Sequence, residues 1–394
     1  MKVKSTPADF VVQEVSSLSL RSSPTDYAVF RLTKSSWDTF DLIDLLARRF
    51  RVRPADISVG GLKDRPGSTD PLISVRGLHD APRSFSEKNY AVVFTGWTDG
   101  PLSARDVSGN RFAITLRDMS APERDAVRVN APTVARDGVP NYYDEQRFGS
   151  ARHGEGFMGK EIFLGNREKA LRLWFTPSKH DDQKTRKMKK CVIENWGRWS
   201  RCAGMGFGEY GRVLAYLAEN HRAFHQALER IDRRFLVFAL NAYQSFLFNE
   251  ILGRWLAARA APVGFTLLPL RYAMGTFQLY GALPAGAAAA MVDVTLPVPG
   301  HDTRCDDPVI RGILDEVLGQ EGIALSDLRV RQMHRIRVGG VERAAVVVPG
   351  DLVLEDPQPD ELYPGRWKAL LRFFLPRGSY ATIVVKRLTL PPGR

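Results

Sequence analysis

The stretch GGLKDRPGST, residues 60–69, follows a run that is typical of a buried strand and contains a single carboxylate, Asp64. The glycines and the proline around it predict a tight, preorganised loop. The flanking cations, Lys63 and Arg65, would keep Asp64 ionised at neutral pH, because a nearby opposite charge favours the charged form. By itself the stretch is more typical of a turn aspartate that accepts backbone hydrogen bonds, so the rest of the chain must decide its role.

The first 150 residues have an α+β texture, in which short β-rich runs surround helical ones. The clearest helix follows Thr39, a favourable N-cap, and repeats apolar residues on one face from Phe40 to Phe50. We expect this helix to pack on a sheet. The predicted strands are Phe10–Val15, Tyr27–Leu32, Ile57–Val59, Leu72–Val75, Tyr90–Phe94 and Phe112–Leu116.

The texture changes to long helical patterns at about residue 153 and returns to strands after about residue 341. The helical patterns include Leu214–Ile231 and Phe235–Ala258, followed by an Ala-Gly-Pro-rich stretch, Ala282–Met291. Strands are predicted over Ala344–Val348, Ala369–Phe374 and Ile383–Val385. We therefore predict one sheet built by residues 1–152 and 342–394 and interrupted by an inserted, mainly helical domain at 153–341.

The composition points to a globular protein with a polyanionic partner. The chain has 394 residues, enough for two domains, with 44% hydrophobic and 25% charged residues. Its 56 Lys and Arg residues against 44 Asp and Glu residues give a net charge of +12 and a pI near 9.7. Such a surface suits nucleic acid better than a small neutral substrate, although basicity also serves solubility.

The three cysteines, Cys191, Cys202 and Cys305, are too few and too scattered for a disulfide framework and form no C-x-x-C pair, which fits a reducing cytoplasm. The first residues lack the apolar core of a signal peptide, and no run of 18 apolar residues occurs. These observations predict a soluble cytoplasmic protein that does not span a membrane.

Several motifs suggest chemistry but lack the context for it. The glycines of Gly206–Gly211 match G-x-G-x-x-G, yet no buried strand precedes them. His221 and His225 lie four residues apart without further metal ligands, and Cys305 lies near His301 in similar isolation, so we expect no metal site.

A basic run, Lys179–Lys190, lies near three tryptophans, Trp174, Trp196 and Trp199. Such a run is commonly a solvated face, but the overall basicity makes contact with RNA phosphates an equal alternative.

Six stretches in order give a specific signal. STPADFVVQEV (5–15), VGGLKDR (59–65), GNRFAITLRDM (109–119), GVPNYYDEQRFG (138–149), NAYQSFLFN (241–249) and LPRGSYAT (375–382) together resemble the TruD family of RNA pseudouridine synthases, which isomerise uridine 13 of tRNA in bacteria. The resemblance covers most of the chain. It implies a pseudouridine-synthase α+β core, with a mixed or antiparallel sheet flanked by helices, and an inserted TRUD domain.

By this resemblance Asp64 is the catalytic carboxylate. Pseudouridine formation breaks the C1′–N1 bond, turns the uracil and rejoins it through C5, so a nucleophile or base beside the ribose is needed and no cofactor or metal is implied. The resemblance leaves open whether Asp64 adds to C1′, adds to the uracil ring or removes a sugar proton.

The resemblance also implies substrate-binding residues, because a flipped uracil needs an aromatic platform and directional hydrogen bonds. Phe10, Asn141 and Tyr380 match substrate-contacting positions, and Tyr143 matches an aromatic slot. Asn141 could bond an imide edge or order its loop, whereas Tyr380 would stack on the uracil. Lys4 would hold a phosphate or help to keep Asp64 ionised. Without the family context, Phe10 and Tyr380 would be read as core residues.

Three positions depart from the family pattern. Tyr143 stands where Phe is usual, Asp144 stands where Gly is common, and Pro71 removes a backbone donor after the catalytic loop. These changes leave the chemistry in place but put the position of the target nucleotide in doubt.

The leading hypothesis is a stand-alone, cofactor-free isomerase that acts on tRNA and needs no protein partner. One alternative is a non-catalytic RNA-binding protein of the same fold, which would not need Asp64. Another is a pseudouridine synthase that acts on a different RNA. A nucleoside hydrolase is disfavoured because no second carboxylate is recognisable.

Overall fold

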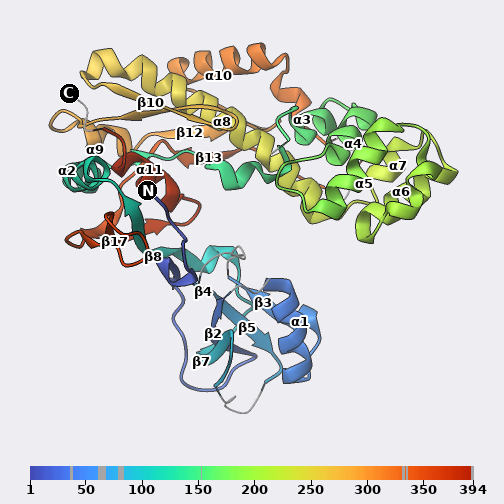
Figure 1. Cartoon of the computed structure of the whole chain (residues 1–394), viewed down its shortest axis with the longest axis horizontal. Helices are drawn as coiled ribbons and strands as arrows, with labels where there is room; N and C mark the ends of the chain where they lie inside the picture. The colour runs from blue at the N-terminus through green and yellow to red at the C-terminus, as the bar shows by residue number, and fades with distance from the viewer. Residues whose placement is uncertain are drawn as a thin grey trace. The chain divides into compact units, whose positions relative to one another are not determined.

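The chain, drawn whole in Figure 1, divides into two compact units. The computed structural model describes residues 1–35, 39–60, 68–78, 84–151, 153–330, 333 and 336–391. Unit 1 combines Met1–Val139 with Val347–Arg394, and unit 2 is Pro140–Val346. The chain passes from unit 1 to unit 2 and back within two short paired strands, β9 (Val139–Pro140) and β14 (Val346–Val347). Unit 2 begins before residue 153 and ends after residue 341, and the assignment of 153–341 as an inserted domain stays a prediction.

Unit 1 is built, within the described residues, on one 11-stranded sheet with the order β15-β17-β8-β1-β4-β2-β5-β3. β16 pairs with β17, and β7 pairs with β2 and β6. The β1–β4 pair is parallel, whereas the neighbouring pairs are antiparallel, so the sheet is mixed. The bounds are β1 (Phe10–Ser16), β2 (Tyr27–Ser35), β3 (Ile57–Val59), β4 (Ser68–Asp70), β5 (Leu72–Arg76), β6 (Phe85–Glu87), β7 (Tyr90–Thr98), β8 (Val107–Met119), β15 (Gly350–Leu354), β16 (Gln358–Pro359) and β17 (Trp367–Pro376).

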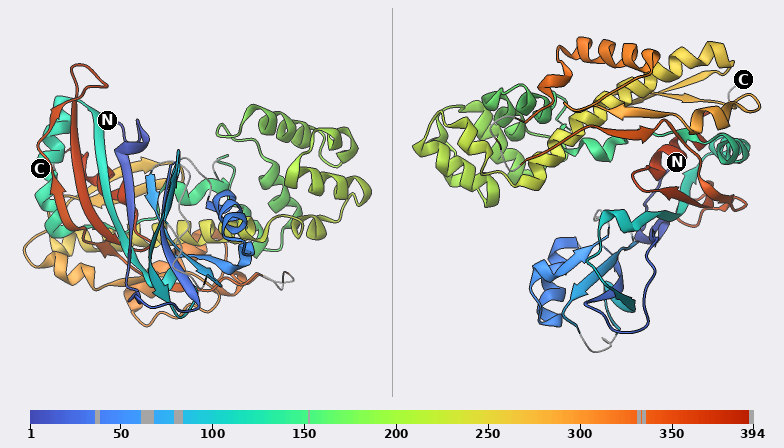
Figure 2. Two further views of the ribbon diagram at one scale, coloured as in Figure 1. Left: turned by 90° about the horizontal axis from the view of Figure 1, so that it is seen from below. Right: turned by 180° about the vertical axis from the view of Figure 1, so that it is seen from behind.

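The pairing of β8 with β17 confirms that strands before and after the helical region share one sheet. The register runs from Trp367 opposite Met119 to Pro376 opposite Gly109. Helix α2 (Ala121–Asp137) packs against β8, β15 and β17 and alongside α11 (Ala381–Leu388), as Figure 2 shows.

Helix α1 (Thr39–Phe50) covers the other part of the sheet, as predicted. It begins at Thr39 itself and places Leu42, Leu46 and Ala47 in the core, all at most 2% exposed. They pack with side chains of β2, β5 and β7, including the fully buried Phe30. Because the apolar residues repeat at helical spacing, one face is buried while the polar residues remain outside.

The prediction of a strand over Ile383–Val385 is wrong, because these residues lie in α11. The β-branched run favoured a strand, but Ala381, Val384, Val385 and Leu388 also follow the i, i+3, i+4, i+7 spacing of a helix. All four are buried. Packing of this apolar face therefore outweighs the local strand preference.

Unit 2 is organised around α8 (Arg233–Val263), which contains the predicted helical pattern Phe235–Ala258 and, within it, the stretch NAYQSFLFN (241–249). By length and composition this helix could span a membrane, but 67% of its most apolar window is buried in the protein, as expected of a core helix. Gly159 of α3 (Met158–Phe163) lets the two helices touch, since a Cβ there would lie 2.3 Å from the Ala239 carbonyl oxygen.

The other elements of unit 2 are mostly helices. They are α4 (Arg167–Phe175), α5 (Gln183–Glu194), α6 (Gly208–Glu219), α7 (Phe224–Leu228), α9 (Ala287–Val292) and α10 (Pro308–Glu321), with hairpin β10 (Leu267–Tyr272) and β11 (Gly275–Tyr280) and the pair β12 (Thr295–Val298) and β13 (Val341–Ala344). The single helix predicted over Leu214–Ile231 is wrong, because α6 ends at Glu219 and α7 starts at Phe224.

Unit 2 contains a disulfide bond that the spacing of the cysteines did not predict. Cys191 in α5 and Cys202 form a disulfide, and Cys305 is a free cysteine. The segment between the two bonded residues contains the short 3-10 helix Trp199–Arg201, and the Cα atoms of the two cysteines lie 6.0 Å apart although the residues are eleven apart in sequence. Sequence spacing alone does not show such a return of the chain.

Candidate active site

The loop that carries Asp64 is anchored at its base by a buried carboxylate. Asp64 itself lies outside the described residues, but both ends of its loop are described. The Gly60 N–H donates to the Leu72 carbonyl oxygen at 3.1 Å, and the Leu72 N–H donates to Glu14 Oε1 at 3.3 Å. Glu14 is 1% exposed. A Cβ at position 60 would lie 2.7 Å from Glu14 Oε1, so glycine lets the carboxylate reach this base.

The chain returns from this loop beside the strand that begins with Phe10. β4 runs parallel to β1, with Ser68 opposite Val11 and Asp70 opposite Gln13. On its other side β1 pairs with β8, where Phe10 is opposite Ile114. The backbone register therefore brings the return of the loop next to the residue that follows Phe10.

Phe10 and Lys4 lie together. The Phe10 ring is 7% exposed and meets Phe112 edge to face, with 6.2 Å between ring centroids. Lys4 Nζ lies 4.2 Å from the centroid of the Phe10 ring, within the range of a cation–π contact. Lys4 has a φ of 68°, a left-handed conformation that is uncommon for residues other than glycine. Phe10 is thus mostly a core residue with a cation on its ring.

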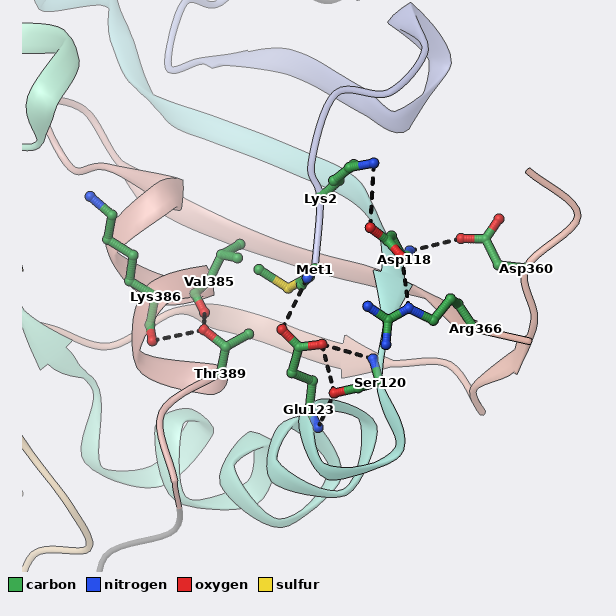
Figure 3. Close-up of polar contacts among 10 residues, drawn as sticks. All are labelled: Met1, Lys2, Asp118, Ser120, Glu123, Asp360, Arg366, Val385, Lys386 and Thr389. Carbon is green, nitrogen blue, oxygen red and sulfur yellow. Dashed lines mark hydrogen bonds and ion pairs between the residues drawn. The ribbon is translucent and has the colours of Figure 1, made fainter. Parts of the chain in front are cut away.

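The first residues of the chain are fastened to β8, as Figure 3 shows. Lys2 pairs with Arg117 through backbone hydrogen bonds of 2.7 and 2.9 Å, and its Nζ lies 3.4 Å from Asp118 Oδ2. Arg366 Nε donates to Asp118 Oδ1 at 2.9 Å, and the Asp118 N–H donates to Asp360 Oδ2 at 2.9 Å. The Arg366 guanidinium, followed by Lys2, lowers the pKa of Asp118.

A buried arginine holds the turn between Lys4 and Phe10. Arg117 Nε donates to Asp9 Oδ1 at 2.7 Å, and its Nη1 donates to Asp360 Oδ1 at 2.9 Å and to Glu361 Oε1 at 3.0 Å. Asp9 Oδ2 also accepts from the Thr6 N–H at 2.6 Å, which closes the turn Pro7–Asp9. Burial works against the charge of Arg117, but hydrogen bonds to the three carboxylates raise its pKa above the ordinary value.

Tyr380 lies at the start of a helix rather than before a strand. It is the N-cap residue of α11, with extended backbone angles, and is half-buried. Its carbonyl oxygen accepts from the Ile383 N–H at 3.0 Å. The ring is therefore attached to a rigid helix terminus in unit 1.

Asn141 belongs to unit 2 and is 6% exposed. Its Nδ2 donates to the Ala344 carbonyl oxygen at 3.1 Å, and its N–H donates to the Ala345 carbonyl oxygen at 2.8 Å. Arg343 donates from Nη2 to Asn141 Oδ1 at 2.7 Å and from Nε to the Asn141 carbonyl oxygen at 2.8 Å. Of the two roles left open by the sequence, these contacts correspond to ordering the loop.

Tyr143 is half-buried among cations and aromatic rings. The Arg343 guanidinium carbon lies 4.1 Å from its ring centroid, and the Phe248 ring meets it edge to face at 5.5 Å. Asn249 of α8 exchanges two hydrogen bonds with the backbone of Tyr143, at 2.9 and 2.8 Å. The neighbouring Asp144 is 4% exposed and accepts from the Glu145 N–H at 2.8 Å, so its carboxylate is buried rather than on an RNA-facing surface.

The basic run Lys179–Lys190 forms α5 and the turn before it. Lys184, Lys187 and Lys190 are exposed, whereas Lys189 is buried and bonds both oxygens of Asp181 at 3.2 Å. Contact of the exposed lysines with phosphate stays a prediction.

The described parts of the chain contain no cluster of three or more His, Cys, Asp or Glu residues arranged to hold a metal ion.

Two residues were missed by sequence reasoning. Glu14 lies on the same, buried face of β1 as Phe10 and Val12, because side chains alternate between the two faces of a strand. A carboxylate at a position that faces the core could therefore have been recognised from the sequence. Arg343 gave no signal, because its partner Asn141 lies about 200 residues earlier in the chain.

The comparisons with known proteins agree with this picture. The family model described as tRNA pseudouridine synthase D (TruD) matches residues 1–388. The protein named "Probable tRNA pseudouridine synthase D 1" of Methanococcus maripaludis is 28% identical over 98% of this chain and 99% of its own length. The protein named tRNA pseudouridine synthase D of Leptospira interrogans is 27% identical over 98% of this chain and 96% of its own.

A crystal structure from Methanosarcina mazei that bears the TruD name superposes with a TM-score of 0.69 and 26% identity, covering 99% of this chain and 94% of that one. The match over nearly all of the chain disfavours the hypothesis of a non-catalytic RNA-binding protein. The chain belongs to the TruD family of tRNA pseudouridine synthases and isomerises uridine to pseudouridine in tRNA.

Proposed function

We propose that this enzyme modifies uridine 13 of tRNA and that Asp64 is its catalytic carboxylate. The observation that carries the proposal is the anchored base of the Asp64 loop, where Glu14 accepts from Leu72 and the chain returns beside Phe10. A loop used in catalysis must present its reactive group in one geometry, and a buried hydrogen bond at its base serves that purpose.

The reaction is an intramolecular rearrangement. The C1′–N1 bond breaks, the uracil turns, the C1′–C5 bond forms, and the proton on C5 is lost while N1 gains one. An ionised carboxylate beside C1′ can act in this sequence as nucleophile or base. The target base must leave its stack to be reached. The free energy lost by unstacking it is offset by contacts between the protein and the flipped nucleotide.

The other residues bind and order rather than react. Tyr380 would stack on the flipped uracil, and Lys4 would neutralise a phosphate or support the charge of Asp64. Phe10 would form the apolar wall beneath Lys4, in keeping with their 4.2 Å contact. Asn141 would order the segment that presents Tyr143, because Arg343 and Ala344 already engage its side-chain amide.

Release of tritium from tRNA that contains 5-tritiated uridine tests the role of Asp64. Asp64→Asn should abolish release while tRNA binding persists, because the amide cannot serve as nucleophile or base. Asp99→Asn is the matched control, since Asp99 is exposed and pairs with Arg21 on the surface. Full activity of Asp64→Asn would reject the assignment.

The target position is tested with tRNA transcripts that differ at one nucleotide. A transcript with cytidine at position 13 should gain no pseudouridine, whereas the parent transcript should gain one at that position. Equal modification of both transcripts would show that a different uridine is the target.

We propose further that the enzyme works in the cytoplasm, because that compartment contains its tRNA substrate. Disulfides such as Cys191–Cys202 are uncommon there, so the compartment needs a direct test. Fractionation of cells that produce the tagged full chain should recover it with cytosolic markers, and recovery with exported proteins would contradict this.

A further inference from the structure

Four arginines lie at and just after the end of α1, where residues 48–53 have the sequence RRFRVR. Arginines after a helix C-terminus are commonly explained by favourable interaction with the helix dipole. That explanation suits Arg48, whose Nε donates to the Asp44 carbonyl oxygen at 3.3 Å. Arg49 instead pairs with Glu87 of β6 at 2.9 Å. Neither explanation accounts for the arginines that follow.

Arg51 has a φ of 58°, at a position where helices usually place glycine. The backbone closes the end of α1 there, because the Val52 N–H donates to the Ala47 carbonyl oxygen at 3.0 Å. A side chain in the left-handed region costs about 1 kcal/mol relative to glycine. The sequence thus retains a strained arginine where glycine would be more stable, which points to use of its side chain.

Arg51 lines a hollow of about 520 Å³ together with Arg53, Arg76 and Asp56. Arg53 donates from Nε and Nη2 to the two oxygens of Asp56, each at 2.9 Å, so its guanidinium is held in place. Within the described residues, Arg51 and Arg76 form no ion pair, and both are exposed. Three arginines against one aspartate leave the hollow positively charged.

We infer that this hollow binds a phosphate group of the tRNA backbone. Guanidinium groups match phosphate oxygens through forked, charge-assisted hydrogen bonds, and a pre-oriented Arg53 reduces the ordering cost. The inference deepens the proposed function, since it concerns how the same tRNA is held, but it does not depend on the role of Asp64.

The hollow lies at the opposite end of the β3–β5 strand pair from Gly60 and Leu72, the described residues on either side of the segment with Asp64. β3 and β5 are antiparallel, with Val59 opposite Ile73 near the loop and Ile57 opposite Val75 near the hollow. The four steps of about 3.3 Å from Leu72 to Arg76 along β5 place these two residues about 13 Å apart. The bound phosphate would therefore belong to a nucleotide other than the one that reacts.

The test measures tRNA binding across a range of salt concentrations in the full chain carrying Asp64→Asn, so that no turnover occurs. The double variant Arg51→Gln/Arg76→Gln should bind tRNA about tenfold more weakly. The slope of log affinity against log salt concentration should be shallower by about 1 than in the parent. The reason is that the variant loses one phosphate contact and therefore releases fewer counterions on binding. An affinity and slope equal to those of the parent would overturn the inference.

The double variant Arg105→Gln/Arg128→Gln is the matched control, because it also removes two positive charges from exposed arginines of unit 1. Arg128 lines a different hollow, of about 300 Å³, that also contains Glu355 and Asp356, which would repel phosphate. This variant should bind tRNA like the parent. An equal loss in the control would mean that net charge alone is responsible, which would overturn the site.

Arg51→Gly separates binding from folding. Glycine accepts the positive φ, so the melting temperature should stay the same or rise while tRNA binding weakens. A clearly lower melting temperature would contradict the strain on which the inference rests.

Competitors identify the source of the bound group. Inorganic phosphate, compared with chloride at equal ionic strength, should compete only weakly with tRNA, because it lacks the contacts of the rest of the polymer. Phosphate that displaces tRNA from the parent but not from the double variant would still support a phosphate site. Binding of poly-glutamate to the parent and not to the double variant, with tRNA affinity unchanged, would instead assign the hollow to an acidic protein and overturn the inference.

Discussion

Arg343 donates two hydrogen bonds to Asn141, one to its backbone carbonyl oxygen at 2.8 Å and one to its side-chain Oδ1 at 2.7 Å. The same guanidinium lies 4.1 Å from the ring centroid of Tyr143. One planar group of β13 thus orients two of the proposed substrate-binding residues. Arg343 is therefore a positioning residue for Asn141 and Tyr143.

Substitution of Arg343 should lower activity more than tRNA affinity. Arg343→Ala should reduce kcat by about 10²-fold, because a shift of about 1 Å in a positioned group can cost that much. Arg343→Lys should recover little, since an ammonium cannot replace the fork. Tritium release under single-turnover conditions measures the effect, and Arg271→Ala, at an exposed position of β10, is the control. Loss of affinity alone would contradict a positioning role.

Glu14→Ala should destabilise the protein by about 1–3 kcal/mol, because the Leu72 N–H would lose its partner in the interior. Glu14→Gln keeps an acceptor oxygen, so it should lower both the free energy of unfolding and kcat less than Glu14→Ala does. Urea unfolding and tritium release measure the two effects. The exposed neighbour Gln13 provides the control as Gln13→Ala, and equal effects of all three variants would argue against a specific anchor.

Arg117→Ala should lower the free energy of unfolding by about 3–5 kcal/mol, because it leaves the buried carboxylates of Asp9 and Asp360 unpaired. Arg111→Ala, on the same strand, removes an exposed pair with Asp351 and should cost less than about 1 kcal/mol. Denaturant unfolding followed by circular dichroism compares them. Similar losses in the two variants would show that burial of the Arg117 cluster does not matter.

The stability supplied by Asp360 should disappear in acid. Burial would raise the pKa of this carboxyl, but hydrogen bonds from the Asp118 and Leu362 N–H groups and from Arg117 hold it below the ordinary value. A lowered folded-state pKa gives stability that is full above the unfolded value of about 3.9 and is lost as the pH falls through the folded value.

Thermal melting as a function of pH tests this. The difference between the parent and Asp360→Asn should be constant from about pH 7 to about pH 5 and should shrink below about pH 4. The surface pair Arg21–Asp99 is the control, and Asp99→Asn should differ little from the parent at any pH. A difference that grows in acid would contradict the sign of the shift.

Patterns that repeat along the chain predicted much of unit 1. The alternation in β1 and the helical repeat in α1 are local, because each follows from which side chains must face the core. The break between α6 and α7 and the helical C-terminus were not predicted, since the same apolar residues suit either structure until their packing partners are known.

The sequence by itself determined the family, the α+β texture and the identity of the candidate residues, because the six stretches and the periodic apolar positions are written in order along the chain. Only the tertiary structure decided which side chains support them. The contacts of Glu14 with Leu72, Arg117 with Asp9 and Asp360, and Arg343 with Asn141 each join distant segments. Such partners are set by sheet register and chain return, for which no local pattern carries the information.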